Sequence, residues 1–245
     1  MSGPTRRAAL IGAAALAAPA ISQAQRRDPR VLRFIPNTGL TVLDPVWTAS
    51  LVTGNHAYHV FDTLYATGSD WKPSPQMAAG HTVDSDWRIW NITLRDNLWF
   101  HDGTPVRAQD CVASVKRWAK RDAFGAVMAA ALDTIDAPDD RTLRFRFKRR
   151  FPRLLEALAR TSALPCMMMP ERFGAADPFT ALTEVVGSGP YRFAADEFNP
   201  GSLAVYKKYD RYVPRQEKAD RTAGGKIANF ERVEWHTMPD RKSVV

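Results

Sequence analysis

Apolar and polar residues alternate in several short stretches of the chain, which is the pattern of a strand with one buried face. Trp90, Ile92 and Leu94 share one side of such a stretch, and polar residues separate them. The same period of two predicts further strands at 31–35, 98–100, 143–147, 191–193, 203–206 and 232–237. We therefore expect several short strands, each with one side in a core.

Between these strands, apolar residues recur with the period of a helix. Ala108, Cys111, Val112, Val115 and Trp118 recur at helical spacing and predict a helix over 108–119. Similar spacing predicts helices over 56–65 and 151–158, whereas 36–39, 68–75, 102–105 and 199–201 carry turn residues. Strands and helices are interspersed, so the pattern predicts an α/β fold of mixed sheets with flanking helices.

The first 24 residues predict an export signal. Arg6 and Arg7 carry the only charges there, and the apolar run from Ala8 to Ile21 is too short to cross a bilayer as a helix. Small residues at Ser22 and Ala24 predict cleavage after Ala24, and the paired arginines resemble a twin-arginine signal. We expect a periplasmic protein whose mature part begins at residue 25.

The composition predicts a packed globular core, because 45% of the 245 residues are apolar and seven Trp and twelve Phe occur. Removing Arg6 and Arg7 lowers the formal net charge from +8 to +6. In an exported protein this basic balance indicates solubility and attraction to acidic partners, and it specifies no ligand.

Cys111 and Cys166 are the two cysteines of the chain. They could pair in an oxidising compartment. Cys111 lies on the apolar face of the helix predicted at 108–119, where a thiol acts as a small apolar side chain. We favour two buried thiols and leave a disulfide open.

Histidine, serine and glycine motifs supply no complete catalytic or metal set. His56 and His59 are three residues apart on a predicted helix, but no acidic residue completes a zinc site and HExxH is absent. His101 and Asp102 adjoin on an extended segment and so point to opposite faces. The segment GSGP at 187–190 fits neither a phosphate-binding loop nor GxSxG. We expect no metal, no cofactor and no enzyme activity.

The segment RTLRFRFKRRFPR at 141–153 interleaves basic and aromatic residues, as a nucleic-acid surface can. An amphipathic strand explains the same pattern, with phenylalanines inward and charges outward. The glycines of an RNA-recognition signature are missing. We expect no nucleic-acid partner.

The most specific pattern is WRIWNITLRDNLWFHDGTPVRAQDCVASVKRW at 87–118, which resembles the signature of family 5 bacterial extracellular solute-binding proteins. Arg107 stands where a threonine is usual, so we expect the helix start to lose a hydroxyl cap worth about 1 kcal/mol. The matching residues are Leu94, Arg95, Asp96, Phe100, His101, Asp102, Gly103, Thr104, Pro105, Ala108, Asp110 and Ser114.

Shorter matches follow in the family's order: LDP at 43–45, FDTL at 61–64, GSGPY at 187–191 and KYDRY at 208–212. The resemblance implies a periplasmic-binding-protein-like fold of two lobes that closes on its ligand and docks on a membrane permease. Members of the family continue well beyond this length. We therefore expect residues 25–245 to form most of the first lobe of a truncated chain, with the second lobe missing and no peptide capture by this chain alone.

The resemblance also implies the ligand class and the partners. Oligopeptides are expected, with nickel chelates, haem or sugars as alternatives, and ABC transporter permease subunits receive the ligand from a monomer. In family members the loop after the first strand lines the cleft, which points to Asn37, Thr38, Gly39 and Leu40 as ligand-binding residues.

Two other classes of function stay open as alternatives. An exported hydrolase would use His101 or Ser188 and lose its turnover on His101→Ala or Ser188→Ala. A nucleic-acid binder would show an affinity that falls steeply with salt.

Overall fold

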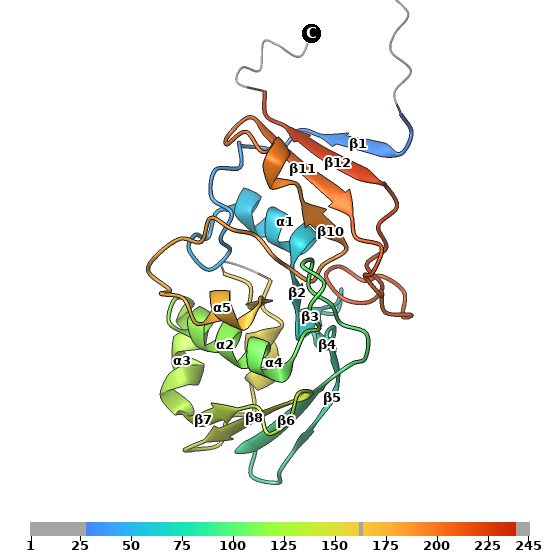
Figure 1. Ribbon diagram of the computed structural model, residues 1–245. Helices are drawn as coiled ribbons and strands as arrows, with labels where there is room; N and C mark the ends of the chain where they lie inside the picture. Colours follow the sequence, from blue (N-terminus) through green and yellow to red (C-terminus); the bar gives the residue numbers. More distant parts are fainter. Residues whose placement is uncertain (1–27, 162–163, 239–245) are drawn as a thin grey trace, which may run out of the picture.

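Two four-stranded sheets, each with its own helices, form the two halves of the computed structural model, which describes residues 28–161 and 164–238 (Figure 1). The first sheet, in the upper part of Figure 1, has the order β1-β12-β11-β10, with β1 parallel to β12 and the other pairs antiparallel. Helix α1 (Leu51–Val60) packs against β10. The strands are β1 (Val31–Phe34), β10 (Tyr191–Phe193), β11 (Leu203–Lys208) and β12 (Arg232–His236).

The second sheet is antiparallel throughout and has the order β5-β6-β8-β7. Four helices accompany it, and the fully buried Trp118 of α2 donates its indole N–H to the carbonyl of Leu164 at 2.7 Å. The elements are β5 (Ala78–Val83), β6 (Ile89–Leu94), β7 (Leu132–Asp136), β8 (Thr142–Phe147), α2 (Ala108–Ala119), α3 (Ala123–Ala131), α4 (Leu154–Leu158) and α5 (Glu171–Gly174).

Short elements connect the two halves. β2 (Asp62–Thr63) pairs with β9 (Met167–Met168), and β3 (Tyr65–Thr67) pairs with β4 (Pro73–Pro75). The 3-10 helix η2 (Ala195–Glu197) follows β10. The buried apolar residues form two clusters, one under each large sheet. The α/β class predicted from the alternation of strands and helices is confirmed.

The helix predicted over 56–65 is wrong in its position. α1 ends at Val60, and the chain becomes extended at Phe61, with φ −109° and ψ 169°. Val60, Phe61 and Leu64 are all buried. Apolar residues on both faces of this short extended segment are buried. Their positions along the sequence therefore resemble the spacing of a helix. The strand predicted at 98–100 is reduced to one bridge between Trp99 and Pro105.

Cys111 and Cys166 are free and fully buried in the core under the second sheet. Burial raises the pKa of both thiols, because a thiolate loses its hydration in an apolar surrounding. The structure therefore agrees with two buried thiols that act as small apolar side chains.

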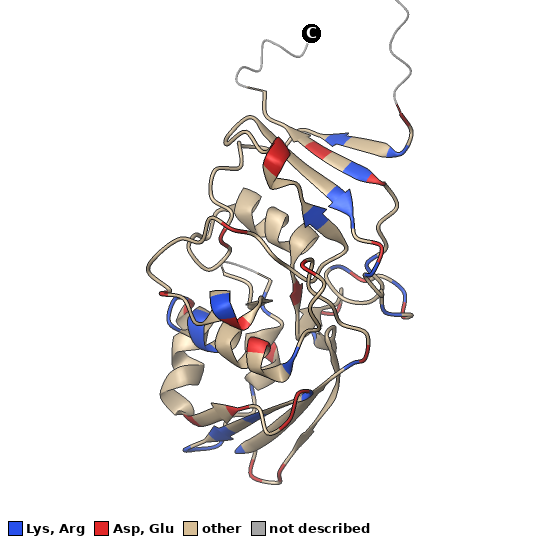
Figure 2. Cartoon of the chain, in the orientation of Figure 1, with Lys and Arg blue, Asp and Glu red and all other residues tan. Residues whose placement is uncertain are grey.

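A network of charges covers the outer face of the first sheet, where blue and red segments alternate along β12 (Figure 2). Arg232 donates to Glu197 at 2.6 Å and to Glu234 at 2.6 Å. Hydrogen bonds from Arg232 and Lys207 lower the pKa of Glu197 to about 2. Hydrogen bonds from His236 and Arg232 lower the pKa of Glu234 to about 2.

These lowered pKa values predict a dependence of stability on pH. A carboxyl group whose pKa falls on folding stabilises the fold above its unfolded pKa of about 4.5, and this contribution is lost as the pH falls towards 2. Glu197→Gln is expected to reduce the drop in Tm between about pH 5 and pH 2.5. Glu156→Gln, at an exposed carboxylate with no ion pair among the described residues, is the control. Equal drops in Tm for Glu197→Gln and the unsubstituted chain would contradict this role.

Candidate functional site

A groove of about 500 Å³ lies beside α1, on the face of the first sheet that β1 and β12 form. Leu32 and Phe34 from β1 and Trp235 from β12 line one side, and Tyr58 and His59 from α1 line the other. The alternation along β1 places Leu32 and Phe34 on the same face. The size and the aromatic walls are typical of sites that hold small ligands.

His59 is the polar group of the aromatic wall. Its Nδ1 lies 2.9 Å from the carbonyl oxygen of Asn55. A carbonyl only accepts, so Nδ1 carries the hydrogen and Nε2 of the neutral ring is an acceptor. Burial lowers the pKa of His59, and the nearby Lys226 ammonium lowers it further. The groove therefore contains a neutral imidazole at pH 7.

His56 lies on the same helix but is fully buried and does not line the groove. Its Nδ1 lies 3.0 Å from the hydroxyl of Tyr206, and burial lowers its pKa to about 3. The aromatic rings of Phe193 and Tyr206 surround it. His56 is thus a core histidine.

Two cations, Arg221 and Lys226, line the groove. Lys226 Nζ is 2.8 Å from Asp62 Oδ1, so its charge is compensated. The guanidinium of Arg221 lies 3.7 Å from the ring centroid of Trp71, and no ion pair is found for it among residues 28–161 and 164–238. Arg221 and Trp71 both have left-handed backbone, with φ 54° and 63°. The groove therefore suits a solute with an apolar body and one anionic group.

The predicted ligand loop lies outside this groove. Asn37 and Thr38 are exposed, whereas Leu40 is buried and its carbonyl accepts a hydrogen bond from Gly201 N–H at 2.7 Å. A Cβ on Gly39 would stand 2.4 Å from the carbonyl oxygen of Gly201. The loop is packed against the turn between β10 and β11, and its ligand role stays a prediction.

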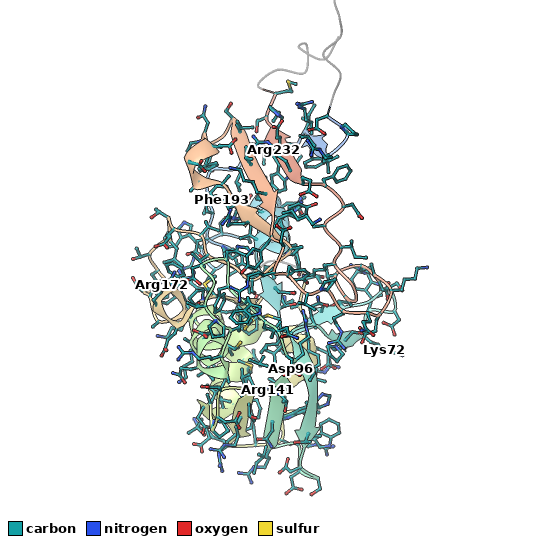
Figure 3. All side chains as sticks on the ribbon, turned by 45° about the vertical axis from the view of Figure 1, so that its right-hand side comes forward. Lys72, Asp96, Arg141, Arg172, Phe193 and Arg232 are labelled. Atoms are coloured by element: carbon teal, nitrogen blue, oxygen red, sulfur yellow. The ribbon has the colours of Figure 1, made fainter. Side chains whose placement is uncertain are left out.

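The first residues of the family signature pack in the core or contact neighbouring segments. Leu94 is buried in the core. Arg95 Nε donates to the carbonyl of Gln76 at 3.1 Å. Asp96 forms an ion pair with Arg141 at 3.0 Å, and both side chains are labelled in the lower half of Figure 3.

The next residues form a joint between the two halves. Phe100 is buried, and its carbonyl accepts the hydroxyl hydrogen of Tyr209 at 2.7 Å. His101 N–H donates to the carbonyl of Gly187, and its ring Nε2 donates to the carbonyl of Gly189 at 3.0 Å. Burial lowers the pKa of His101 to about 4. The ring is neutral and engaged in holding this joint.

A tight turn follows the joint. Asp102 Oδ1 accepts hydrogen bonds from the N–H and the hydroxyl of Thr104 at 3.0 and 2.7 Å. Gly103 has φ +87°, a conformation that favours glycine. Pro105 then forms the bridge with Trp99. The turn-forming role predicted for Asp102 is therefore present.

Asp110 forms the half of a capping box in which the third helical residue bonds back to the cap residue. Arginine has no acceptor atom, but Asp110 Oδ2 accepts the N–H of Arg107 at 2.8 Å. Its other oxygen accepts the N–H of Glu171 at the start of α5, also at 2.8 Å. Ser114 accepts the N–H of Met169 at 3.0 Å, and Ala108 is buried. These bonds fasten the start of α2 to the segment that leads into α5.

A hydrolase would need a serine nucleophile hydrogen-bonded to a base. Among the described residues, His101 and Ser188 do not form such a pair. Ser188 is buried, and its hydroxyl has no partner there. His101 Nδ1 is also without a partner. Over the same residues, no group of three His, Cys, Asp or Glu side chains could hold a metal ion. His101 and Ser188 therefore form no hydrogen-bonded catalytic pair within the described residues.

Residues 142–147 of the basic and aromatic segment form β8, which is an amphipathic strand. Leu143, Phe145 and Phe147 are buried. Arg144 bonds to Asp136 of β7, and Figure 2 shows blue and red side by side on these strands. The charges of this face are therefore mixed in sign.

Sequence reasoning missed most of the groove. His59 was singled out, and Leu32 and Phe34 were placed on a predicted strand, but Trp235 and Arg221 were not connected with them. These residues meet because β1 pairs with β12, some two hundred residues later in the chain. Alternation within one strand carries no information about its partner.

Comparisons with known proteins agree with the signature. The family profile of bacterial extracellular solute-binding proteins, family 5 Middle, matches residues 72–245. A probable peptide ABC transporter periplasmic-binding protein of Sinorhizobium fredii is 36% identical over 94% of this chain and 43% of its own length. The periplasmic oligopeptide-binding protein OppA of Salmonella typhimurium is 28% identical over 75% of this chain and 37% of its own length. The chain thus spans less than half the length of these curated relatives.

Solved structures show the same fold. DppA from Helicobacter pylori, in complex with the peptide STSA, has a TM-score of 0.67 and 19% identity over 87% of this chain and 43% of that one. NikA from Brucella suis, in complex with Fe(III)-EDTA, has a TM-score of 0.68 and 18% identity over 88% of this chain and 41% of that one. The periplasmic-binding-protein-like mixed sheets predicted from the resemblance are confirmed.

Proposed function

The chain belongs to the bacterial extracellular solute-binding proteins of family 5, and we propose that it is part of a protein that captures a solute and delivers it to the permease of an ABC transporter. The observation that carries this proposal is the 36% identity with a probable peptide-binding relative over 94% of the chain. The relatives are named as binding proteins. Binding and release, without a catalytic step, is the proposed activity.

Peptides are the proposed ligands. The relatives from Sinorhizobium fredii and Salmonella typhimurium are named for peptides, which supports this class. The groove contributes apolar walls, the acceptor Nε2 of His59 and the cation of Arg221, which suit an apolar side chain and a carboxylate. Nickel chelates, haem and sugars are the alternative ligands.

The proposed place of action is the periplasm. The two relatives are periplasmic by name. We propose that residues 1–24 direct export, by the twin-arginine route, and are removed after Ala24. This segment lies outside the described residues. Within those residues, no helix is long and apolar enough to cross a membrane. Residues 25–245 are proposed to be part of the solute-binding domain.

The loop from Asn37 to Leu40, outside the groove, is a second proposed ligand contact, and its two exposed side chains allow a clean test. We expect Asn37→Ala with Thr38→Ala to weaken peptide binding about tenfold, through the loss of one or two hydrogen bonds. The measurement is isothermal titration of a chimera in which residues 28–238 replace the matching segment of the Sinorhizobium relative.

A control separates the loop from general surface effects. Asn229→Ala removes another exposed amide, outside the loop, and is expected to leave the affinity unchanged. Equal affinities of the loop variant and the control would contradict the ligand role. Hydrolysis of a peptide that disappears in Ser188→Ala would contradict the proposed binding function itself.

A further inference from the structure

Two turns from distant parts of the chain meet beside the groove. The first joins β3 to β4 and carries Trp71. The second spans residues 220–223, where Asp220 and Ala223 bond to each other in both directions at 2.9 Å, and Arg221 lies at its tip. In Figure 1 the second turn belongs to the orange-red segment between β11 and β12, which lies beside β3 and β4.

Hydrogen bonds fasten the second turn to the first. The hydroxyl of Thr222 accepts the N–H of Thr67 at 3.0 Å and donates to the carbonyl of the same residue at 3.1 Å. Asp220 Oδ2 accepts the N–H of Ser69 at 2.9 Å and its hydroxyl hydrogen at 3.2 Å. These bonds lie on both sides of Arg221 in the sequence. The backbone that carries Arg221 is therefore fixed relative to the first turn.

Trp71 and Arg221 both have a backbone conformation that residues other than glycine rarely adopt. Their φ angles are 63° and 54°. A side chain makes this conformation costly, because its Cβ crowds the backbone, and glycine would form either turn without that cost. Strain of this kind persists where the surrounding structure holds it, and it is frequent at functional sites. The two side chains presented in this way are the two that contact each other.

The contact between them restrains a guanidinium without using its hydrogen-bond donors. The guanidinium of Arg221 lies 3.7 Å over the ring centroid of Trp71, and a guanidinium stacks on an aromatic ring through its face. Its N–H groups lie in its plane and point away from that face. Arg232, in contrast, donates to Glu197 and Glu234. Stacking leaves the donors of Arg221 available to a ligand.

We infer that Trp71 is a positioning residue that holds Arg221 for a carboxylate of the ligand. Arg221 lines the groove and Trp71 does not, so Trp71 would act on the ligand only through Arg221. A carboxylate accepts two parallel N–H bonds from a guanidinium, and a guanidinium that is already held loses less conformational freedom on binding. The role assigned to Arg221 rests on the proposed function, in which the groove holds a peptide, and it adds the group that selects the ligand.

Titration of the chimera with three tripeptides tests this selection. They are a neutral tripeptide with a free C-terminal carboxylate, its C-terminal amide, and a tripeptide amide with glutamate in the middle. The free carboxylate is expected to bind about tenfold more tightly than the amide. Affinity recovered by the glutamate peptide would assign the site to any ligand carboxylate, whereas affinity that stays low would assign it to the C-terminus.

Four variants connect this preference to the stack. Arg221→Gln is expected to lower the ratio of the two affinities about tenfold, and Trp71→Ala about threefold. Trp71→Phe keeps an aromatic face and the same Cβ, so it is expected to retain most of the preference. In the Arg221→Gln background, Trp71→Ala is expected to change the ratio no further. A residue that only supports the fold would weaken the binding of both peptides alike.

Arg211→Gln is the matched control. Its guanidinium lies 3.8 Å from the ring centroid of Trp99, and Arg211 does not line the groove. This variant is expected to leave the preference unchanged, and circular dichroism reports whether each variant is folded. If the chimera does not fold, nitrogen-15 NMR of the Arg221 side chain in the 245-residue chain decides, with the same tripeptides at millimolar concentration. Its N–H signals are expected to move with the free carboxylate and not with the amide.

The outcomes separate the role of this stack from the proposed function. A folded chimera that binds none of the three peptides would contradict both. A chimera that binds peptide with a preference unchanged by Arg221→Gln would overturn the role of Arg221 alone. An effect of Trp71→Ala on the ratio that is equally large in the Arg221→Gln background would overturn the positioning role of Trp71. Unmoved Arg221 signals in the NMR measurement would overturn both roles.

Discussion

Asp44→Ala is expected to lower the free energy of unfolding by about 3–5 kcal/mol, because it leaves the Arg117 guanidinium buried without its counter-charge. Both side chains of this ion pair are 0% exposed. Asp44 Oδ1 lies 3.1 Å from Arg117 Nη1, and Asp44 Oδ2 lies 2.6 Å from Nη2. The geometry is the bidentate one that suits an arginine and a carboxylate.

The same carboxylate also serves two backbone donors. It accepts the N–H of Val46 at 2.9 Å and the N–H of Leu182 at 3.0 Å. Arg117 Nη2 donates to the carbonyl of Thr180 at 3.2 Å. Asp44 therefore holds the LDP segment, α2 and residues 180–182 together, and its removal leaves several buried groups unpaired.

Urea unfolding followed by tryptophan fluorescence measures the effect. Asp28→Ala breaks an exposed ion pair with Arg30 and is expected to leave the stability nearly unchanged. The double variant Asp44→Leu with Arg117→Met removes both charges and is expected to recover part of the loss. A loss for Asp44→Ala no larger than that for Asp28→Ala would show that the pair is not buried.

Gly187→Ala is expected to cost about 3 kcal/mol or more, because the added methyl group has no space. A Cβ at this position would stand 2.0 Å from the carbonyl oxygen of Val60 and 2.7 Å from its carbonyl carbon. Backbone atoms cannot rotate away as a side chain can. The strain falls on the joint where His101 N–H donates to the carbonyl of Gly187 at 2.8 Å.

Gly54→Ala gives the matched control on α1. A Cβ there meets no atom within 4 Å. Alanine favours a helix over glycine, so this substitution is expected to stabilise the fold by up to about 1 kcal/mol. Opposite changes in Tm for Gly187→Ala and Gly54→Ala are the expected result of a thermal melt. A stability change of the same sign and size in both would contradict the close packing at Gly187.

Periodicity predicted the elements that have one buried face. β6 and β8 alternate cleanly because their inner residues pack in the core and their outer residues meet solvent or charges. α2 follows the same principle at helical spacing. Periodicity failed at Val60 to Leu64, where consecutive residues are buried whatever their direction. Local pattern cannot separate a helix from an extended segment there.

The local sequence pattern could not predict which residues pair across long distances in the chain. Nothing near Arg117 in the sequence distinguishes it from its neighbour Lys116, yet Arg117 is buried and paired with Asp44, 73 residues earlier. The groove depends on the parallel pairing of β1 with β12. The residues of the family signature bond to one another or to segments that lie beside them in the fold. The signature residues are not among those that line the groove.

Solute capture is the central claim of the proposed function. Its most direct test is a titration of the chimera, in which residues 28–238 replace the matching segment of the Sinorhizobium relative, with peptides of two to five residues. The chimera, checked for folding by circular dichroism, is expected to bind peptide with a dissociation constant in the range of about 0.1–10 µM. The unsubstituted relative is titrated beside it. A folded chimera that binds no peptide, while the relative does, would contradict the proposal that residues 28–238 form part of a peptide-binding site.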